Sequence, residues 1–408
     1  MKKITLLSLL TIGLLIGLTA CYEEMEFEDS LGEPNLPEQA MDYASLQLPE
    51  HMKNTFLSFS NNIFGQPGVK PNPGLMNSPN FFDPNLINNT NTTLGPANPV
   101  VSNHGATLGR VLFYDTRLSI NNSISCASCH KQELAFSDNA QFSKGFGGKI
   151  TPRNSMAIIN SGLNHNLFWD SRVHSVTQLA LEPVRNHIEM GMESMEVLEK
   201  KLAATDFYPE LFAKAYGKSA INSTKIADAM AQFVCSIISS NSKFDKGVAS
   251  NFSNFTELEK MGRALFFSSK AKCSECHAGS NFSAPDNPHS NDPYGSPEIG
   301  GTAVIGLELS AKDKGKNNGS FRIPSLRNVG LTGPYMHDGR FASLDQVVDH
   351  YNSGIQAHPE LDPKFIDKDG KPLKMNLNAI EKKALVAFLK TLTDESITKD
   401  ARYANPFN

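Results

Sequence analysis

The chain has 408 residues, of which 40% are hydrophobic, and its formal net charge at pH 7 is −4. This length allows two domains of ordinary size, with enough apolar residues for a substantial core. The mild negative charge, without a basic stripe, argues against a nucleic-acid-binding protein, so we expect no nucleic-acid partner.

The N-terminus predicts export and attachment to a membrane by a lipid. Lys2 and Lys3 precede an uncharged run over residues 4–20, and Leu18-Thr19-Ala20-Cys21 resembles a bacterial lipobox. The run is short for a membrane span, so we interpret residues 1–21 as a lipoprotein signal peptide with Cys21 as the lipidated residue. An uncleaved anchor and a plain secretory signal are the alternatives. We expect the protein in the periplasm or on the outer membrane, and the acidic cluster after Cys21 leaves the cell surface open.

Residues 22–100 are rich in Asn, Pro, Ser and Gly, and the stretch 88–93 has no hydrophobic period. We interpret them as a linker or N-terminal extension, with a short helix expected around residues 43–57. The first folded domain should therefore begin near residue 101.

Helices follow in the first half of the chain. One is expected at Leu108-Gly109-Arg110-Val111-Leu112-Phe113, shortly before the motif Cys126-Ala127-Ser128-Cys129-His130. Residues 195–202 and 226–238 place apolar residues three and four positions apart, which predicts two more helices. Cys235 lies in the second of these and is interpreted as an inert buried thiol.

The second half of the chain repeats this order. Met261-Gly262-Arg263-Ala264-Leu265-Phe266 precedes Cys273-Ser274-Glu275-Cys276-His277. Repetition at so long a period indicates two related domains, which we place at 101–248 and 249–408 because Ser, Asn and Gly gather at 242–255. Residues 278–320 are expected to form a long surface loop and residues 380–392 a helix. No run of alternating strand residues is convincing, so the fold should be mainly α-helical.

Each Cys-x-x-Cys-His motif has the residues that covalent haem attachment requires. The two thiols add to the two vinyl groups of haem, and the following His binds the iron. A zinc site could use the four thiols, but it would not need a His after each pair. The motifs therefore predict two haem c groups, held by Cys126, Cys129 and His130 and by Cys273, Cys276 and His277.

Over residues 105–395 the chain resembles the bacterial di-haem cytochrome c peroxidases and the related MauG-type enzymes. Besides the haem motifs, the matching segments are Leu108-Gly109-Arg110, Leu118-Ser119, Ala135-Phe136-Ser137-Asp138, Arg153-Asn154, Phe168-Trp169-Asp170-Ser171-Arg172, Glu189-Met190-Gly191, Pro324-Ser325-Leu326-Arg327-Asn328-Val329 and Pro334-Tyr335-Met336-His337-Asp338-Gly339. Ser171 departs from the Gly that is usual in the family. The resemblance implies two cytochrome-c-like haem domains with long loops and an active site near their interface.

The resemblance also implies roles for individual residues. Hydrogen peroxide would react at the haem of His130, and electrons would enter at the haem of His277. Glu189 matches the family's distal glutamate, which moves protons while the O–O bond breaks. Trp169 matches a tryptophan that assists electron transfer between the haems. The alternatives are a solvated helix-cap carboxylate for Glu189 and core filling for Trp169.

Some members of the family block the reactive iron with a His until a reductant displaces it. The matching segment, between His130 and Asn154, contains no His in this sequence. We therefore expect a five-coordinate first haem that needs no reductive activation.

The sixth ligand of the second haem is open among three residues. Family spacing from His337 favours Tyr351, and Met336 and His350 are its rivals. A Tyr ligand would favour ferric iron, whereas Met would raise the reduction potential.

The resemblance further implies a calcium ion between the domains. Asn154, Thr332 and Pro334 match its protein ligands, the last two through backbone oxygens, which suits a hard cation that retains waters. The alternative for Asn154 is a simple turn or capping role.

The preferred function is reduction of hydrogen peroxide to water with electrons from a c-type cytochrome or a cupredoxin. One alternative is a MauG-like oxidase of a protein or organic substrate, which Tyr351 supports. The other is a non-enzymatic electron-transfer lipoprotein, against which Glu189 argues. A homodimer is left open.

Overall fold

The computed structural model describes residues 32–45, 49, 51–52, 98–164, 166–283, 301–308 and 312–407. The predicted signal peptide 1–21, with Cys21, and most of the predicted linker 22–100 lie outside these residues. Within the helix expected at 43–57, residues 51–52 are helical. From Glu33 onward the described chain belongs to one unit. None of the helices in the described ranges is long and apolar enough to span a membrane.

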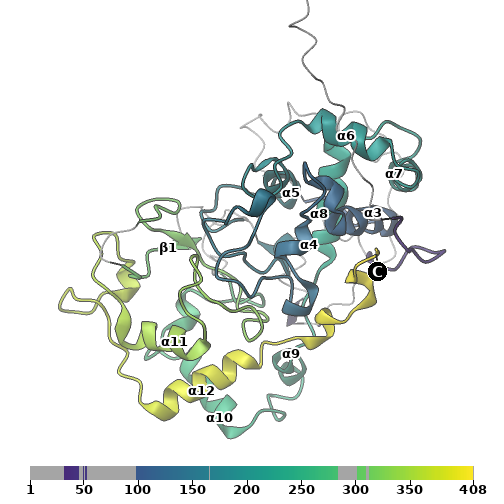
Figure 1. Cartoon of the computed structure of the whole chain (residues 1–408). Coiled ribbons are helices and arrows are strands. Elements are labelled where there is room, and N and C mark those ends of the chain that lie inside the picture. Colours follow the sequence, from purple (N-terminus) through teal and green to yellow (C-terminus); the bar gives the residue numbers. More distant parts are fainter. Residues whose placement is uncertain are drawn as a thin grey trace, which may run out of the picture. The chain divides into compact units, whose positions relative to one another are not determined.

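Helices dominate the described chain, which confirms the predicted mainly α-helical class (Figure 1). They are α3 (Asn103–Tyr114), α4 (Cys126–Cys129), α5 (Val176–Arg185), α6 (Met195–Ala203), α7 (Tyr208–Tyr216), α8 (Ser223–Ser236), α9 (Lys243–Val248), α10 (Glu257–Phe266), α11 (Leu344–Asp349) and α12 (Ala379–Lys390). The short 3-10 and π turns are η1 (Thr116–Leu118), η2 (Gln132–Leu134), η3 (Phe146–Gly148), η4 (Ser161–Leu163), η5 (Cys273–Glu275), η6 (His350–Gly354), η7 (Pro363–Phe365), η8 (Glu395–Thr398) and η9 (Ala401–Tyr403).

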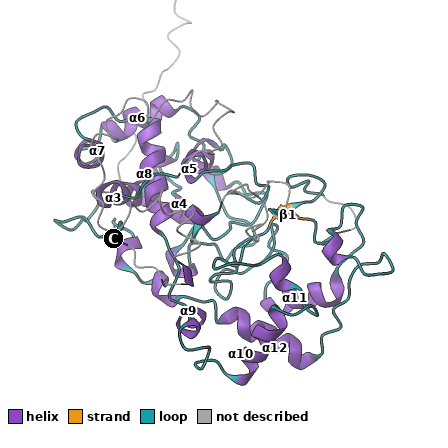
Figure 2. Ribbon diagram, turned by 180° about the vertical axis from the view of Figure 1, so that it is seen from behind, coloured by secondary structure: helices purple, strands orange, loops and turns teal. Residues whose placement is uncertain are grey.

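Long loops connect these helices, and Figure 2 shows how little strand they contain. The strands β1 (Thr302–Ala303) and β2 (Phe321–Arg322) form one antiparallel pair, with Thr302 opposite Arg322. β1 lies within the predicted loop 278–320. Two residues per strand are too few to give an alternating sequence pattern, which is why the pair was not predicted.

Three helices agree with the predicted periodicity. The expected helices 195–202, 226–238 and 380–392 are α6, α8 and α12, with ends displaced by at most three residues. Each begins after a side chain that accepts a backbone N–H of the first turn: Ser194, Asn222 and Asn378. Such caps satisfy donors that the helix itself leaves unpaired, and they mark the starts that periodicity alone places poorly.

The repeat seen in the sequence is a repeat of one helix crossing. α3 packs on α8, and α10 packs on α12. A Cβ on Gly109 would strike the backbone carbonyl of Ala229 in α8, and a Cβ on Gly262 would strike that of Ala384 in α12. The glycine of each Gly-Arg pair therefore lets two helix backbones touch.

Buried aromatic side chains fill the space around each crossing. The C-terminal segment returns to the first half, where the buried Tyr403 donates its hydroxyl to the carbonyl of Ser236 at 2.7 Å. Residues of the predicted domain 249–408 thus contribute to both cores. The predicted boundary region 242–255 contains α9, and the division at residue 248 stays a prediction. The main aromatic residues are Phe113, Phe136, Phe233 and Tyr403 in the first core and Phe266, Phe282 and Phe388 in the second.

Candidate functional site

The first Cys-x-x-Cys-His motif forms the short helix α4, and His130 follows at its C-cap. The chain then turns back through η2, so that the Nδ1 atom of His130 lies 3.2 Å from the carbonyl oxygen of Phe136. A ring that donates from Nδ1 presents a neutral Nε2 lone pair, which is the form that binds iron. Burial lowers the pKa of His130, which also favours the neutral ring.

The second motif has the same local geometry. The Nδ1 atom of His277 lies 3.2 Å from the carbonyl oxygen of Phe282. Burial lowers the pKa of His277 to about 4, so the ring is neutral at pH 7. Both predicted haem ligands are therefore oriented by a backbone carbonyl five or six residues further along the chain.

The thiols beside these His residues are neutral. Burial raises the pKa of Cys126 to about 12, of Cys129 to about 11 and of Cys273 to about 12. Among the residues that the structure describes, no group of three or more His, Cys, Asp or Glu side chains could hold a metal ion. The four thiols thus form two separate pairs, which suits two haem groups and not one zinc site. Cys235 is fully buried in α8, as expected for a structural thiol.

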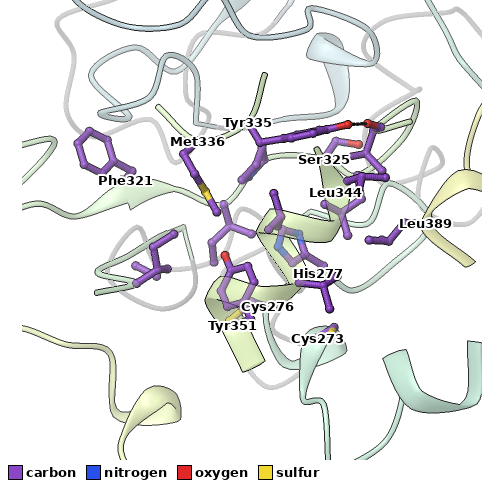
Figure 3. A pocket seen from close by; sticks show the side chains of 18 of the residues that line it. Cys273, Cys276, His277, Phe321, Ser325, Tyr335, Met336, Leu344, Tyr351 and Leu389 are labelled. Carbon is purple, nitrogen blue, oxygen red and sulfur yellow. Dashed lines mark hydrogen bonds between the residues drawn. The ribbon is translucent and has the colours of Figure 1, made fainter. Parts of the chain in front are cut away.

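A cavity of about 230 Å³ lies beside the second motif. Its walls are mostly apolar, and Figure 3 shows Cys273, Cys276 and His277 on one side of it. Such walls, with two thiols and an imidazole presented together, fit a haem better than a polar ligand. Several other predicted residues also line this cavity: Asn154, Trp169, Thr332, Pro334, Met336 and Tyr351.

Two of the three candidates for the sixth ligand lie on this cavity. Met336 and Tyr351 both line it, and Figure 3 shows their sulfur and hydroxyl oxygen directed inward. Burial raises the pKa of Tyr351, with smaller contributions from Cys276 and Cys273. His350 is not among the lining residues, and its Nε2 lies 3.0 Å from the carbonyl oxygen of Ile305. The geometry therefore favours Met336 and Tyr351 over His350.

Trp169 is held at the edge of the same cavity by two hydrogen bonds. Its indole Nε1 donates to the backbone oxygen of Asn154 at 2.9 Å. Its own carbonyl accepts from the backbone N–H of Arg322 at 2.7 Å. The backbone of Trp169 is thereby tied to β2 in the second half, although Trp169 follows the first haem motif in the chain.

The side chain of Asn154 is also fixed in orientation. Its Nδ2 donates to the carbonyls of Ala140 and Gln141 at 3.1 and 3.2 Å. This leaves Oδ1 as the atom that would bind a cation. Thr332 and Pro334 line the same cavity as Asn154.

Glu189 belongs to the first site and not to this cavity. Its charge helps to raise the pKa of both Cys126 and Cys129, which places the carboxylate close to the first thiol pair. Asn186 donates its Nδ2 to Oε1 of Glu189 at 2.9 Å. Burial is the largest influence on Glu189 and raises its pKa. A half-buried carboxyl with one oxygen engaged and one free is arranged to exchange protons.

The segment where some relatives carry a blocking His is packed against Glu189. The backbone N–H of Phe146 donates to the Glu189 carbonyl at 2.8 Å, and Lys149 Nζ donates to the His187 carbonyl at 2.9 Å. A Cβ on Gly145 would strike the carbonyl oxygen of Ile188. The segment is therefore held in place at Gly145, Phe146 and Lys149.

Several residues that shape these sites are not predictable from residue type and spacing. The carbonyls of Phe136 and Phe282 orient the two His ligands, but a backbone atom leaves no signal in residue type. Asn186 precedes Glu189 by three residues, and that spacing within a turn could have suggested their contact. Arg322 lines the second cavity, and a lone Arg beside an apolar segment gave no indication of this.

Comparisons with known proteins agree with this geometry. Residues 103–252 match the family model of the di-haem cytochrome c peroxidases. The chain is 34% identical to the methylamine utilization protein MauG of Methylorubrum extorquens, covering 73% of this chain and 80% of that protein. It is 32% identical to the cytochrome c551 peroxidase of Nitrosomonas europaea, covering 71% of this chain and 80% of that protein.

Solved structures show the same likeness. A MauG-like protein associated with microbial copper homeostasis superposes with a TM-score of 0.66 at 32% identity, covering 76% of this chain and 94% of that one. The diheme peroxidase BthA of Burkholderia thailandensis has a TM-score of 0.57 at 21% identity, covering 74% of this chain and 87% of that one. The second likeness concerns the fold alone.

Proposed function

Because this chain belongs to the di-haem cytochrome c peroxidase family, we propose that it reduces hydrogen peroxide to water with electrons from a small donor protein. The donor would be a c-type cytochrome or a cupredoxin. Haem bound at the two Cys-x-x-Cys-His motifs supplies the iron chemistry of this reaction. The single observation that carries the proposal is Glu189, a half-buried carboxyl close to the first thiol pair.

Glu189 is proposed as the group that moves protons. Asn186 engages Oε1, so Oε2 is the atom that would accept a proton from peroxide and return it to the departing oxygen. Burial raises the pKa of this carboxyl, which brings it nearer to the pH at which the reaction runs. A base whose pKa is close to the working pH is the most effective one.

The first site is proposed to be open in the oxidised protein. The segment between His130 and Asn154 has no His, and it is held by hydrogen bonds from Phe146 to the carbonyl of Glu189 and from Lys149 to that of His187. A side chain of that segment would have to break these contacts to reach the site.

Trp169 is proposed to assist electron transfer towards the first site. The hydrogen bond from its indole to Asn154 fixes the ring at the wall of the second cavity, and its backbone bond with Arg322 fixes the chain at this point. A rigid aromatic ring suits this role better than a mobile one, because its position relative to both sites stays constant.

For the sixth ligand of the second site we favour Tyr351, with Met336 as the rival on the same cavity. A calcium ion held by Asn154, Thr332 and Pro334 is also proposed, since Asn154 Oδ1 is directed by the bonds of its amide nitrogen. Export, lipid attachment through Cys21 and a homodimer remain proposals from the sequence.

The MauG-like alternative is favoured by one observation. Tyr351, the candidate Tyr ligand, lines the second cavity. Such an enzyme would oxidise a protein or organic molecule instead of taking electrons from a donor. A purely electron-carrying protein is disfavoured, because it would not need the Glu189 carboxyl near an attachment site.

Substitution of Glu189 tests the proposal. Glu189→Gln keeps the size and hydrogen bonding of the side chain but removes the base. General acid–base groups commonly contribute about 10²–10⁴-fold, or roughly 3–5 kcal/mol of barrier. We expect stopped-flow mixing of oxidised protein with peroxide to show a loss of this size.

In the unaltered protein the rate should fall as the pH drops through the pKa of Glu189, because the protonated carboxyl cannot accept a proton.

A folding defect would be recognised by a second measurement on the same variant. Glu189→Gln should still carry two haem groups, and donor protein should still reduce the second one at the normal rate. Asn186→Ala is the matched control: it leaves the carboxyl in place, so it should slow the reaction less than Glu189→Gln does. Unchanged peroxide kinetics in Glu189→Gln would remove this residue from the mechanism.

A further inference from the structure

Arg322 is a buried cation that pairs with no described carboxylate. It lies in β2, and its side chain is only 8% exposed. Nε donates to the carbonyl of Phe168 at 3.1 Å, and Nη2 lies 3.1 Å from the sulfur of Met156. A carbonyl and a thioether are neutral, so neither compensates the positive charge.

Two other buried arginines in the described ranges have the anion that Arg322 lacks, whereas the buried Arg110 contacts the carbonyls of Ala401 and Arg402 and the sulfur of Met41. Arg327 holds both oxygens of Asp245 at 2.9 and 3.0 Å. Arg117 lies 3.2 Å from an oxygen of Asp115. Burying a charge is costly unless it is paired, so an unpaired guanidinium at the wall of a cavity favours a negatively charged group there. Arg322 lines such a cavity, and Arg110 does not. Burial alone lowers the pKa of Arg322 to about 10, which still leaves it charged at pH 7.

The position of Arg322 indicates what that partner is. Arg322 lines the cavity of the second haem motif together with His277 and Cys273. Haem carries two carboxylate groups, which need compensation when a mostly apolar cavity encloses them. Lys272 also lines the cavity but is partly exposed, so water screens its charge, and Arg327 is already paired with Asp245.

We propose that Arg322 binds a carboxylate of the second haem and raises the reduction potential of its iron. The planar guanidinium suits a carboxylate, with which it can form two parallel hydrogen bonds. A fixed positive charge disfavours the more positive ferric state, so electrons are retained more readily at this site. The inference rests on the haem assignment of the proposed function but not on peroxide chemistry.

Reduction potential and thermal stability of the two-haem protein test the proposal. In a spectroelectrochemical titration, Arg322→Gln should shift the equilibrium of the second haem about tenfold towards the ferric form, or about 59 mV for one electron. Arg322→Lys keeps the charge and should shift it less. Arg402→Gln removes an arginine that pairs with Asp400 and does not line the cavity, and it should shift nothing.

The melting temperature of Arg322→Met shows whether Arg322 is paired with an anion in the haem-loaded protein. Replacing a buried charge without a partner by an apolar group of similar length should raise the melting temperature, whereas breaking a buried pair should lower it. We expect Arg322→Met to lower the melting temperature of the haem-loaded protein. A higher melting temperature, or an unchanged potential in Arg322→Gln, would overturn the proposal.

Two further outcomes are decisive. If the Gln and Met variants fail to load haem while Arg322→Lys loads two groups, the site requires a cation, as proposed. If all three variants fail alike, the shape of Arg322 matters and not its charge, and the proposal is wrong. A potential that follows the concentration of added acetate would place a free anion at Arg322, which would also contradict the proposal. None of these measurements depends on peroxide turnover.

Discussion

His130 and His277 each direct one ring nitrogen at a backbone carbonyl, that of Phe136 or Phe282, at 3.2 Å. The hydrogen bond fixes the ring and its tautomer, so the remaining nitrogen is presented towards the place where iron binds. The two sites differ in what surrounds them: Glu189 lies close to the first thiol pair, and Tyr351 lines the cavity at the second. Both sites thus have a His held in the same way, but their neighbouring side chains differ. This difference suits two haem groups with different functions.

Tyr351 is expected to bind the second iron. Tyr351→Phe should then change the low-spin signal of the oxidised protein, whereas His350→Ala should leave it intact because His350 faces the Ile305 carbonyl. Electron paramagnetic resonance of the purified protein measures this signal. The rival assignment has its own signature: loss of the signal in Met336→Leu alone would make Met336 the ligand.

At the scale of elements, the same kind of helix crossing occurs twice in the described chain. α3 meets α8 at Gly109, and α10 meets α12 at Gly262. In both crossings the glycine faces a backbone carbonyl of the partner helix, which cannot move aside as a flexible side chain could. Each haem motif follows the first helix of its crossing in the chain, Cys126 after α3 and Cys273 after α10.

Gly262→Ala should destabilise the protein, because Gly262 lies where α10 and α12 touch. The added methyl group would strike the Ala384 carbonyl and force the helices apart, which costs about 1–3 kcal/mol. Gly354→Ala is the matched control: its methyl group would have its nearest contact at 3.5 Å, so we expect a change within about 0.5 kcal/mol. Denaturant unfolding of both variants gives the comparison, and equal stabilities would mean that the crossing tolerates separation.

The segment 141–149 packs against residues 187–189, next to Glu189. Its Gly145 is in backbone contact with Ile188, and Phe146 and Lys149 bond to the carbonyls of Glu189 and His187. The segment contains no His that could bind the iron, and these contacts restrict its movement towards the first site.

The oxidised protein, as isolated, should therefore contain one high-spin haem. Its electronic spectrum should show that state without any treatment, and peroxide should react without a lag. Prior incubation with a reductant is the control, and it should not accelerate the first turnover. Two fully low-spin haem groups, with a lag that a reductant abolishes, would show that another side chain blocks the iron.

At the scale of the whole molecule, local features were predictable and distant contacts were not. The haem motifs, the periodic helices α6, α8 and α12 and the repeated Gly-Arg pairs are all visible in short stretches of sequence. The return of Tyr403 to Ser236, the bonds that hold Trp169 and the burial of Arg322 join residues far apart in the chain. Neither periodicity nor spacing reports which distant residue will face which, and the two-residue strands are too short to show a period.

The stoichiometry of turnover tests the central claim most directly. Limiting hydrogen peroxide is added to the two-haem protein with an excess of reduced cytochrome c, and the oxidised donor is counted spectroscopically. Reduction of peroxide to water takes two electrons, so we predict two molecules of donor oxidised for each peroxide consumed. Peroxide that disappears without oxidation of the donor, and with oxidation of an added protein or organic substrate instead, would contradict the account and establish the MauG-like alternative.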